Sequence, residues 1–301
     1  MSKKVTVKVP ATTANLGPGF DSLGMALNLY NTVVLEEAEN LGCEIEIVGE
    51  GETFLPRDTT NLVFRAVETL AKRACYRSRG WKLRLENRIP LQRGLGSSAA
   101  AIVGGLIAAN SITGNRFTSH ELLLQAIEIE GHPDNVVAAL FGGVVVVVEH
   151  ENSYLYTRFF LPQGLKVYAV VPDFPLATKT ARSVLPETVF FKDAVFNLAR
   201  VALLTAALRE GNWDLLSVAV QDRLHQPYRS ELIPGFKEVL KAAHDAGAYG
   251  AFLSGAGPAV IALAPPGSKA GEAMKGAFRN HGFEAEVWNL EPSQQGAHVL
   301  E

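Results

Sequence analysis

Two kinds of hydrophobic periodicity alternate along this chain and together predict a mixed α and β protein. In the first half, alternating apolar and polar residues predict half-buried strands at 5–9, 32–37, 44–48 and 81–86. Apolar residues at helical spacing predict helices at 61–75, 98–110 and 119–130, with Ser119 capping the last one. A short helix should follow up to Leu140, and Gly142-Gly143 should open a continuous apolar strand, 144–149, that is buried on both faces.

A polar stretch at 150–158 separates these elements from a second set. That set comprises a strand at 166–171, helices near 193–210, 213–222 and 235–246, strands at 250–253 and 259–264, a helix at 268–282 and a strand at 283–288. Its β-α-β-β-α-β-like order predicts a ferredoxin-like second domain. We therefore expect two domains, residues 1–155 and residues 156–301.

Composition and charge narrow the class of protein. The 301 residues are 48% hydrophobic and 20% charged, and 28 basic residues face 31 acidic ones. The basic residues are scattered, which excludes a nucleic-acid partner, and the longest apolar runs are far shorter than the roughly 20 residues of a membrane span. Two distant cysteines, Cys43 and Cys75, fit a reducing compartment. The first nine residues form a charged, alternating pattern unlike a signal peptide, so we expect a cytoplasmic protein with no membrane partner.

The segment 90–101 carries the most specific chemistry. Gly94, Gly96, Ser97 and Ser98 stand where a strand gives way to an apolar helix, and a helix N-terminus of this kind favours phosphate. A Walker A loop is excluded because the chain has no Gly-Lys pair. The dinucleotide pattern G-x-G-x-x-A is matched at 94–99, but no acidic strand end follows it. The remaining alternative is a serine N-cap with glycines forming a turn.

Further polar clusters punctuate the chain. The segment 10–21 contains Asn15 and Asp21, residues 132–135 read His-Pro-Asp-Asn, and the glycine-rich stretch 254–258 joins two apolar segments. Glu128 and Glu130 close a predicted helix, where only one of the two can face a site. A carboxylate at a helix C-terminus is disfavoured by the dipole, so a nearby cation such as Mg²⁺ would explain it. Each cluster taken alone also fits an ordinary turn or a solvated charge.

Taken together, segments 10–21, 90–101 and 253–258 resemble, in this order, the three motifs of the GHMP small-molecule kinases. Within that superfamily, Thr12-Thr-Ala-Asn-Leu-Gly-Pro-Gly-Phe-Asp21 resembles the homoserine kinases, and so does Glu130-Gly-His-Pro-Asp-Asn135 followed by Gly142-Gly143. The Gly-Glu-His element of galactokinases and mevalonate kinases is absent. A catalytically inactive relative would lack Ser98, the glutamate pair or Asp21, and all of these are present.

The resemblance implies a fold and a reaction. The fold would be a two-domain α+β architecture, with an N-terminal ribosomal-protein-like ATP-binding domain containing a left-handed crossover and a C-terminal ferredoxin-like domain. The reaction would be ATP-dependent phosphorylation of the side-chain hydroxyl of L-homoserine, a step of threonine biosynthesis. A kinase for another small alcohol is the alternative, and a homodimer is left open.

The resemblance also implies how ATP and Mg²⁺ are held. Adenine would lie near Asn61 and Leu62, and Ser98 with Glu128 would bind Mg²⁺, Glu130 being the alternative to Glu128. The phosphates would lie on the glycine-rich loop. The nucleotide would therefore contact Asn61, Leu62, Leu91, Gln92, Arg93, Gly94, Leu95, Gly96, Ser97, Ser98, Ala99, Ala100 and Ala101.

For homoserine, the resemblance implies contacts with Asn15, Asp21, His132, Asn135, Arg182 and Arg229. Guanidinium groups suit the α-carboxylate, and Asp21 with Asn15 suits the ammonium group. Asn135 or His132 would orient the attacking hydroxyl and, with Ser98 and Glu128, would complete the catalytic set. Mevalonate kinases use an aspartate base at the position of Asp134, whereas homoserine kinases manage without one. The sequence contains both Asp134 and Asn135 and leaves this choice open.

Overall fold

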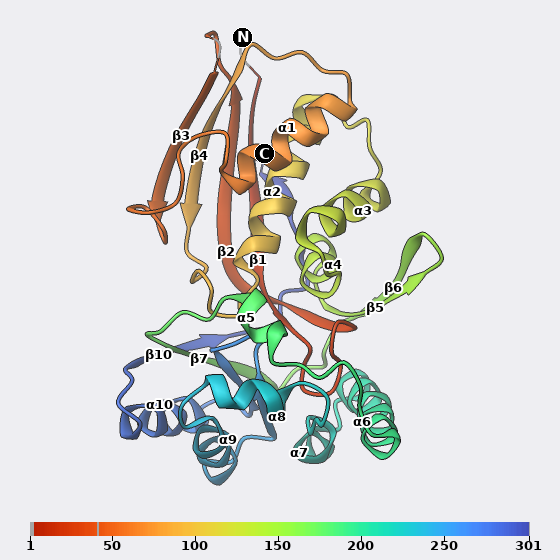
Figure 1. Cartoon of the computed structure of the whole chain (residues 1–301), viewed down its shortest axis with the longest axis vertical. Coiled ribbons are helices and arrows are strands. Elements are labelled where there is room, and N and C mark those ends of the chain that lie inside the picture. The colour runs from red at the N-terminus through yellow and green to blue at the C-terminus, as the bar shows by residue number, and fades with distance from the viewer. Residues whose placement is uncertain (1–2, 41, 301) are drawn as a thin grey trace.

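Two β-sheets organise the chain, one in each half (Figure 1). The computed structural model describes residues 3–40 and 42–300, so Met1 and Ser2 of the charged, alternating N-terminal pattern lie outside the described residues. The first half contains β1 (Lys4–Ala14), β2 (Leu23–Glu37), β3 (Gly42–Gly49), α1 (Leu62–Arg73), β4 (Gly80–Asn87), α2 (Ser97–Ile112), α3 (Ser119–Glu130), α4 (Asp134–Phe141), β5 (Val144–His150) and β6 (Ser153–Phe159).

The second half is richer in helices. It contains β7 (Lys166–Pro172), α5 (Thr178–Ser183), α6 (Phe191–Glu210), α7 (Leu216–Ala219), α8 (Gln226–Arg229), α9 (Phe236–Asp245), β8 (Gly250–Leu253), β9 (Val260–Ala264), α10 (Ala270–Asn280), β10 (Ala285–Leu290) and β11 (His298–Leu300), with short 3-10 turns at Trp213–Leu215 and Ser230–Leu232.

The N-terminal sheet has seven strands in the order β11-β1-β2-β4-β3, with β5 paired to β2 and β6 paired to β5. The long strand β2 holds it together, since its first three residues pair with β5 and its last six with β4. Strands β3 and β4 are parallel and are joined through α1. The left-handed crossover expected in this domain stays a prediction.

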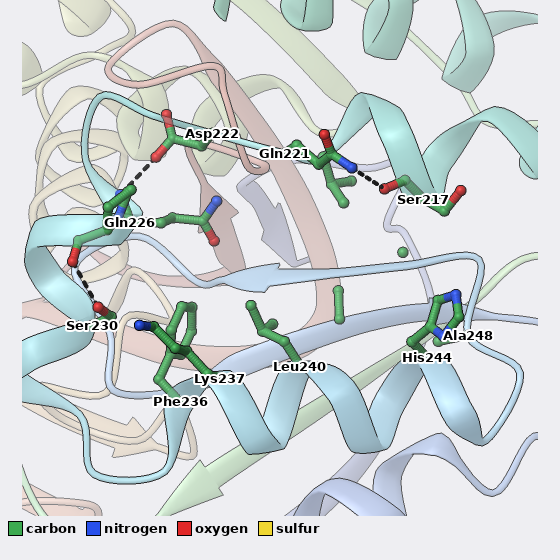
Figure 2. Close-up of a pocket in the computed structure, with 14 residues that line it drawn as sticks. Ser217, Gln221, Asp222, Gln226, Ser230, Phe236, Lys237, Leu240, His244 and Ala248 are labelled. Atoms are coloured by element: carbon green, nitrogen blue, oxygen red, sulfur yellow. Dashed lines mark hydrogen bonds between the residues drawn. The ribbon is translucent and has the colours of Figure 1, made fainter. Parts of the chain in front are cut away.

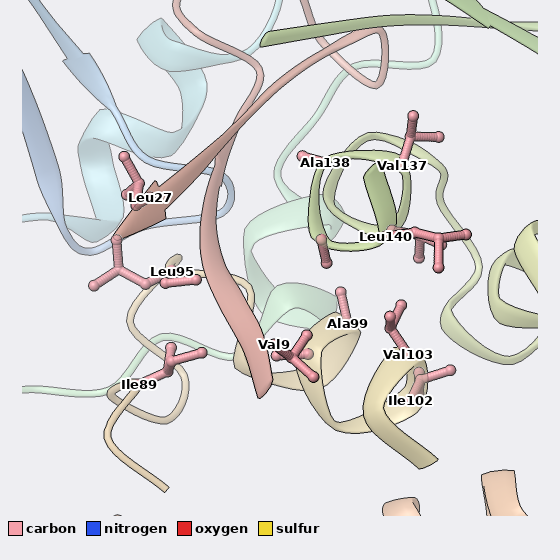
Figure 3. Packing of buried hydrophobic residues seen from close by; sticks show 14 of the residues in the cluster. Val9, Leu27, Ile89, Leu95, Ala99, Ile102, Val103, Val137, Ala138 and Leu140 are labelled. Carbon is pink, nitrogen blue, oxygen red and sulfur yellow. The ribbon is translucent and has the colours of Figure 1, made fainter. Parts of the chain in front are cut away.

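Helix α2 forms the centre of the N-terminal core. It carries no charged residue, and it packs against β1, β2, α1, α3 and α4. Figure 3 shows Ala99, Ile102 and Val103 of α2 facing buried side chains from β1 and α4. Each fully buried aliphatic side chain of this kind contributes about 1.5–3 kcal/mol. The core therefore fixes the start of α2, where the glycine-rich loop lies.

The C-terminal sheet has four antiparallel strands in the order β10-β7-β9-β8. With helices between β7 and β8 and between β9 and β10, this is the ferredoxin-like arrangement, and that prediction is confirmed. Helices α9 and α10 pack side by side below the sheet in Figure 1. Helices α5 to α8 are additional; in Figure 1, α5 lies between this sheet and the N-terminal domain, α8 lies close to α9, and α6 and α7 lie at the lower right.

The segment 150–158 differs from the sequence-based prediction. Most of it is strand β6, which pairs with β5 along its whole length. The expected boundary between residues 155 and 156 therefore falls inside a strand of the first sheet, and we propose instead that the domains divide between Phe159 and Lys166. The polarity of this segment misled the prediction because β6 is an edge strand whose side chains are largely exposed.

Three smaller differences concern the cap of one helix, the end of another and one additional strand. Thr118, not Ser119, caps α3, in a reciprocal capping box with Glu121. The helix expected at 213–222 ends at Ala219 and gives way to a loop. Strand β11 was not predicted, and it returns the chain to the N-terminal sheet beside β1. On the way, the segment 291–297 hydrogen bonds to β2 and its surroundings, including a main-chain bond from Ser293 to Ala26.

Candidate active site

A cleft between the two domains collects most of the polar motifs of the sequence. Its walls come from the loop between β1 and β2, the start of α2, the turn before α4, helices α5 and α8, and the turn between β8 and β9. The residues that line it are Asn15, Asp21, Gln92, Gly94, Gly96, Ser97, Ser98, Glu130, His132, Asp134, Asn135, Leu176, Thr178, Arg182, Arg229, Gly255, Ala256 and Gly257. Segments more than 200 residues apart in sequence thus meet at one site.

The start of α2 is open to this cleft. Its N-cap is Gly96 in the left-handed conformation, with no side-chain cap, so the serine N-cap interpretation is wrong. A Cβ at Gly96 would lie 1.8 Å from Oγ1 of Thr12, and one at Gly94 would lie 2.1 Å from the carbonyl oxygen of Ser254. Glycine is therefore required at both positions. The first N–H groups of α2 keep the unpaired donors and the positive dipole end that suit a phosphate.

The carboxylate beside this helix start belongs to Glu130. Oγ of Ser98 donates to Oε2 of Glu130 at 2.6 Å, and the Glu130 side chain is only 8% exposed. Glu128 is exposed and does not line the cleft, so the expectation that Glu128 faces the site is corrected to Glu130. Burial raises the pKa of Glu130, although the Ser98 hydrogen bond opposes this shift.

A divalent cation would find few protein ligands here. Within residues 3–40 and 42–300, no group of three or more His, Cys, Asp and Glu side chains is arranged to hold a metal ion. The oxygens of Ser98 and Glu130 are the potential metal ligands beside the glycine-rich loop. Mg²⁺ suits such a site, because it commonly takes one or two carboxylates and completes its shell with water and substrate phosphates.

The turn before α4 forms a hydrogen-bonded cluster. Oδ1 of the buried Asp134 accepts from the Asn135 main-chain N–H at 2.8 Å and lies 3.1 Å from Nδ1 of His132. Oδ1 of Asn135 accepts from the Thr12 hydroxyl at 2.7 Å. Burial alone would lower the pKa of His132, but the hydrogen bond and charge of Asp134, with the charge of Glu130, raise it above its ordinary value.

The loop between β1 and β2 places Asn15 and Asp21. The amide of Asn15 donates to the Gly255 carbonyl at 2.9 Å, and its oxygen accepts from the Asp21 N–H at 3.0 Å, so this side chain joins the two domains. Both oxygens of Asp21 accept from Arg182, at 2.7 and 3.0 Å. Arg182, which we expected to bind a substrate carboxylate, is thus already paired with Asp21. The Asp21 hydrogen bond raises the pKa of Arg182 further.

Arg229 differs from Arg182 in burial and in its partners. It is 1% exposed, and its guanidinium donates to the carbonyl oxygens of Ala181 and Gly255. No carboxylate lies within ion-pair distance of it among the residues that the structure describes. Burial first, and then the charge of Arg182, lowers its pKa to about 10, so it stays cationic near neutral pH. A buried cation without a carboxylate partner is costly, and an anionic ligand would offset that cost.

Several expected nucleotide contacts lie outside the cleft. Oδ1 of Asn61 caps α1 by accepting from the Val63 N–H at 2.9 Å, and its amide donates to the Pro56 carbonyl. Neither Asn61 nor Leu62 lines the cleft. Arg93 lies at the domain boundary, where it donates to the carbonyl oxygens of Pro172 and Asp173. The adenine position therefore stays a prediction.

Two aromatic rings that the sequence reasoning did not assign lie beside the arginines. Phe20 faces both guanidiniums, at 5.3 Å from Arg182 and 5.1 Å from Arg229. The imidazole of His225 lies 5.3 Å from the Phe20 ring. Phe20 belongs to the motif segment 10–21 and His225 stands four residues before Arg229, but no periodicity indicates that they meet. Their proximity depends on contacts between the two domains.

A second hollow lies on the outer side of α8, between α7, α9 and β8 (Figure 2). Its exposed lining is mostly apolar, and it includes Phe236 and Leu240 of α9. Asp222, at its edge, already caps the start of α8. No pair of carboxylates or cations converges there, so the chemistry belongs to the cleft.

Comparison with known proteins agrees with this arrangement. The model of the GHMP kinases N-terminal domain matches residues 61–143, and that of the GHMP kinases C-terminal domain matches residues 204–282. The chain is 48% identical over 293 residues to a homoserine kinase of Carboxydothermus hydrogenoformans, covering 97% of this chain and 96% of the relative. It is 46% identical over 295 residues to a homoserine kinase of Moorella thermoacetica, covering 98% and 99%.

Solved structures resemble the fold as well. The crystal structure of a homoserine kinase from Cytophaga hutchinsonii superposes with a TM-score of 0.90 at 34% identity, covering 100% of this chain and 98% of that one. None of the helices in the described part of the chain has the length and apolar character needed to cross a membrane.

Proposed function

We infer the reaction from a premise that the comparisons establish, namely that this chain belongs to the homoserine kinase family of the GHMP kinases. It transfers the γ-phosphoryl group of ATP to the side-chain hydroxyl of L-homoserine, which yields ADP and O-phospho-L-homoserine for threonine biosynthesis. The observation that carries this conclusion is the match to homoserine kinases at 41–48% identity over most of the chain. The hydroxyl oxygen forms the new P–O bond, and its proton is released.

The buried guanidinium of Arg229 supports an amino-acid substrate. An alcohol without a carboxylate would leave this cation unpaired, whereas the α-carboxylate of homoserine would neutralise it. We propose that Asn15, Asp21, His132, Asn135 and Arg182 surround the rest of the substrate. Because Asp21 is paired with Arg182, the substrate ammonium would share that carboxylate with the guanidinium.

The open start of α2 supports phosphate binding. We propose that residues 91–101 cradle the ATP phosphates, and that the adenine lies towards the start of α1 near Asn61 and Leu62. Ser98 and Glu130 would hold Mg²⁺, which neutralises phosphate charge when it is bound. A buried carboxylate whose pKa burial raises is a fitting ligand, because a cation offsets the cost of its charge.

Positioning of the hydroxyl is the task that we assign to Asn135 and His132. Phosphoryl transfer passes through a loose transition state, in which positioning and charge stabilisation supply most of the catalysis. Oδ1 of Asp134 accepts from the Asn135 N–H and lies against Nδ1 of His132, so Asp134 supports the turn on which both residues stand. We therefore propose that no general base is obligatory.

A substrate panel tests the reaction. Purified enzyme with Mg·ATP should release ADP most efficiently with L-homoserine, less with L-serine and least with 3-aminopropan-1-ol, which lacks the carboxylate. ³¹P NMR should identify the product as a phosphomonoester of homoserine. A higher kcat/KM for a non-amino-acid alcohol such as mevalonate would replace this proposal with the alternative of another small-alcohol kinase.

We also propose a cytoplasmic homodimer. The free cysteines Cys43 and Cys75 suit a reducing compartment.

Helix α6 presents large exposed apolar side chains, with Phe191 84% and Leu198 70% exposed, and a second copy would cover them. Light scattering after size-exclusion chromatography should give twice the mass of the chain, and Leu198→Glu should shift the protein to monomer.

A further inference from the structure

We propose that His225 is a positioning residue. It orients the Arg229 guanidinium towards the substrate carboxylate and connects this guanidinium by hydrogen bonds to the loop between β1 and β2. This inference rests on the proposed function only in its choice of substrate. Three observations support it: the hydrogen bonds of the imidazole, the anchoring of α8, and the packing of Phe20.

The neighbours of the imidazole assign its tautomer. Nε2 of His225 lies 2.6 Å from the carbonyl oxygen of Gly17, and Nδ1 lies 3.3 Å from Nη1 of Arg229. A carbonyl only accepts and a guanidinium only donates. Nε2 therefore carries the proton, Nδ1 offers its lone pair to Arg229, and the ring is neutral.

A charged imidazole would not fit this position. A proton on Nδ1 would point at a cation, and His225 is fully buried. Burial lowers the pKa of His225, and the charge of Arg229 acts in the same direction, whereas Asp222 opposes it. The neutral ring therefore links a main-chain carbonyl of the N-terminal domain to a guanidinium of the C-terminal domain.

The helix that carries Arg229 is anchored at the same place. One oxygen of Asp222 accepts from the main-chain N–H group of His225 at 3.0 Å. The same oxygen accepts from the main-chain N–H group of Gln226 at 2.6 Å (Figure 2). The other oxygen accepts from the Leu224 N–H and from the amide of Asn197. Because α8 is only four residues long, it has little rigidity of its own. The Asp222 cap and the His225 side chain, which lie 3.6 Å apart, both hold the N-terminal end of α8.

Phe20 completes the support on the side of the N-terminal domain. Its ring packs against the imidazole and faces both guanidiniums, so the two arginines meet one aromatic side chain. Phe20 and Gly17 belong to the loop that also carries Asp21. A change in this loop is therefore transmitted through His225 to Arg229.

The test separates the two hydrogen bonds of His225. His225→Asn places an amide oxygen near the position of Nδ1 and keeps an acceptor for Arg229. His225→Gln places an amide nitrogen near the position of Nε2 and keeps the donor to Gly17. His225→Leu keeps neither. His244→Leu, at the exposed end of α9, is the matched control.

The measurements are KM and kcat for L-homoserine and for 3-aminopropan-1-ol, KM for ATP, and the melting temperature. For His225→Gln and His225→Leu we expect the preference for homoserine over the decarboxylated analogue to fall about 10-fold or more, the value of a hydrogen bond to a charged group. KM for ATP should stay within about twofold of wild type, and His225→Asn should retain most of the preference.

Three outcomes would overturn the proposal. The first is an unchanged preference in His225→Gln and His225→Leu, whether or not the melting temperature falls, because a merely structural residue would affect both alcohols equally. The second is a preference lost in His225→Asn but kept in His225→Gln. The third is an imidazolium at His225 in the wild-type protein at neutral pH. Labelling with ¹⁵N-histidine measures this, and the imidazole shifts should show a neutral Nε2–H ring for His225.

The NMR measurement does not depend on the substrate. If wild-type enzyme fails to phosphorylate homoserine, the proposed function fails while the state of His225 is still measured. If it phosphorylates homoserine and the preference is insensitive to residue 225, only the positioning role fails.

Discussion

The hydroxyl of Ser98 reaches Oε2 of Glu130 across 2.6 Å and joins the first turn of α2 to the last residue of α3. The contact brings two oxygen ligands to the place where the unpaired N–H groups of α2 face the cleft. The ends of two helices thus define the region where phosphate charge and a cation would meet.

We predict that Glu130→Gln raises the Mg²⁺ concentration needed for half-maximal activity about 10-fold or more, because loss of a direct ligand should cost at least as much as loss of a supporting group. Initial rates over a magnesium titration measure this. Glu128→Gln is the matched control, since Glu128 is exposed on the same helix. A response to Glu128→Gln that equals that of Glu130→Gln would remove both residues from the metal site.

Asp134→Asn should keep kcat within about 10-fold of wild type, because an amide oxygen can still accept from His132 and from the Asn135 N–H, and a true general base would contribute about 10²–10⁴-fold. Rate profiles against pH measure the difference. An acidic limb that is present in wild type and vanishes in Asp134→Asn would identify Asp134 as the base.

Asn135→Leu should lower kcat about 100-fold, because it removes the partner of the Thr12 hydroxyl and the amide that we assign to the substrate hydroxyl. Steady-state kinetics measure this, with circular dichroism to confirm folding. Activity close to that of wild type would show that Asn135 does not orient the hydroxyl.

Arg229→Leu should weaken homoserine binding by about 2–4 kcal/mol, the loss expected when a buried charge pair loses one partner. Calorimetric titration with homoserine measures this, and ATP binding should be nearly unchanged. Arg279→Leu, which removes an exposed arginine paired with Glu284, serves as the control. Equal homoserine affinity in wild type and Arg229→Leu would exclude Arg229 from the site.

Stability should depend on pH through His132. Its pKa is raised in the folded protein, so from pH 6.5 up to that raised pKa the folded state binds more protons than the unfolded state. The free energy of unfolding should therefore fall as the pH rises through this window. Urea denaturation between about pH 6.5 and 9 measures it, and His132→Gln should flatten the decline. An unchanged slope in His132→Gln would assign the effect to other groups.

The sequence identified the parts of the site that adjacent residues specify. Gly94 to Ser98 and His132 to Asn135 were recognised because turn chemistry and ligand groups lie within a few residues of each other. Spacing along a helix shows only that one of Glu128 and Glu130 faces inward, and the resemblance to the family favoured Glu128. Which one does so depends on how α3 packs against α2, and this is a property of the tertiary structure.

Contacts between distant segments escaped prediction for the same reason. Asp21 and Arg182 are 161 residues apart. The sequence indicates two independent substrate contacts, whereas in the folded protein the two side chains are hydrogen bonded to each other. Strand β6 was missed because a strand at a sheet edge needs only main-chain pairing, and its exposed side chains left no alternating pattern. Strand β11 is three residues long, too short to show a period.

The return of the chain to the first sheet through β11 has a mechanical consequence. The polypeptide passes between the domains twice, at 160–165 and again after Leu290, where hydrogen bonds fasten it to β2. Two covalent attachment points therefore hold the halves together, in addition to a hydrophobic cluster that contains residues of both and main-chain hydrogen bonds between them. A protease cut in either passage would also leave the halves joined by the other.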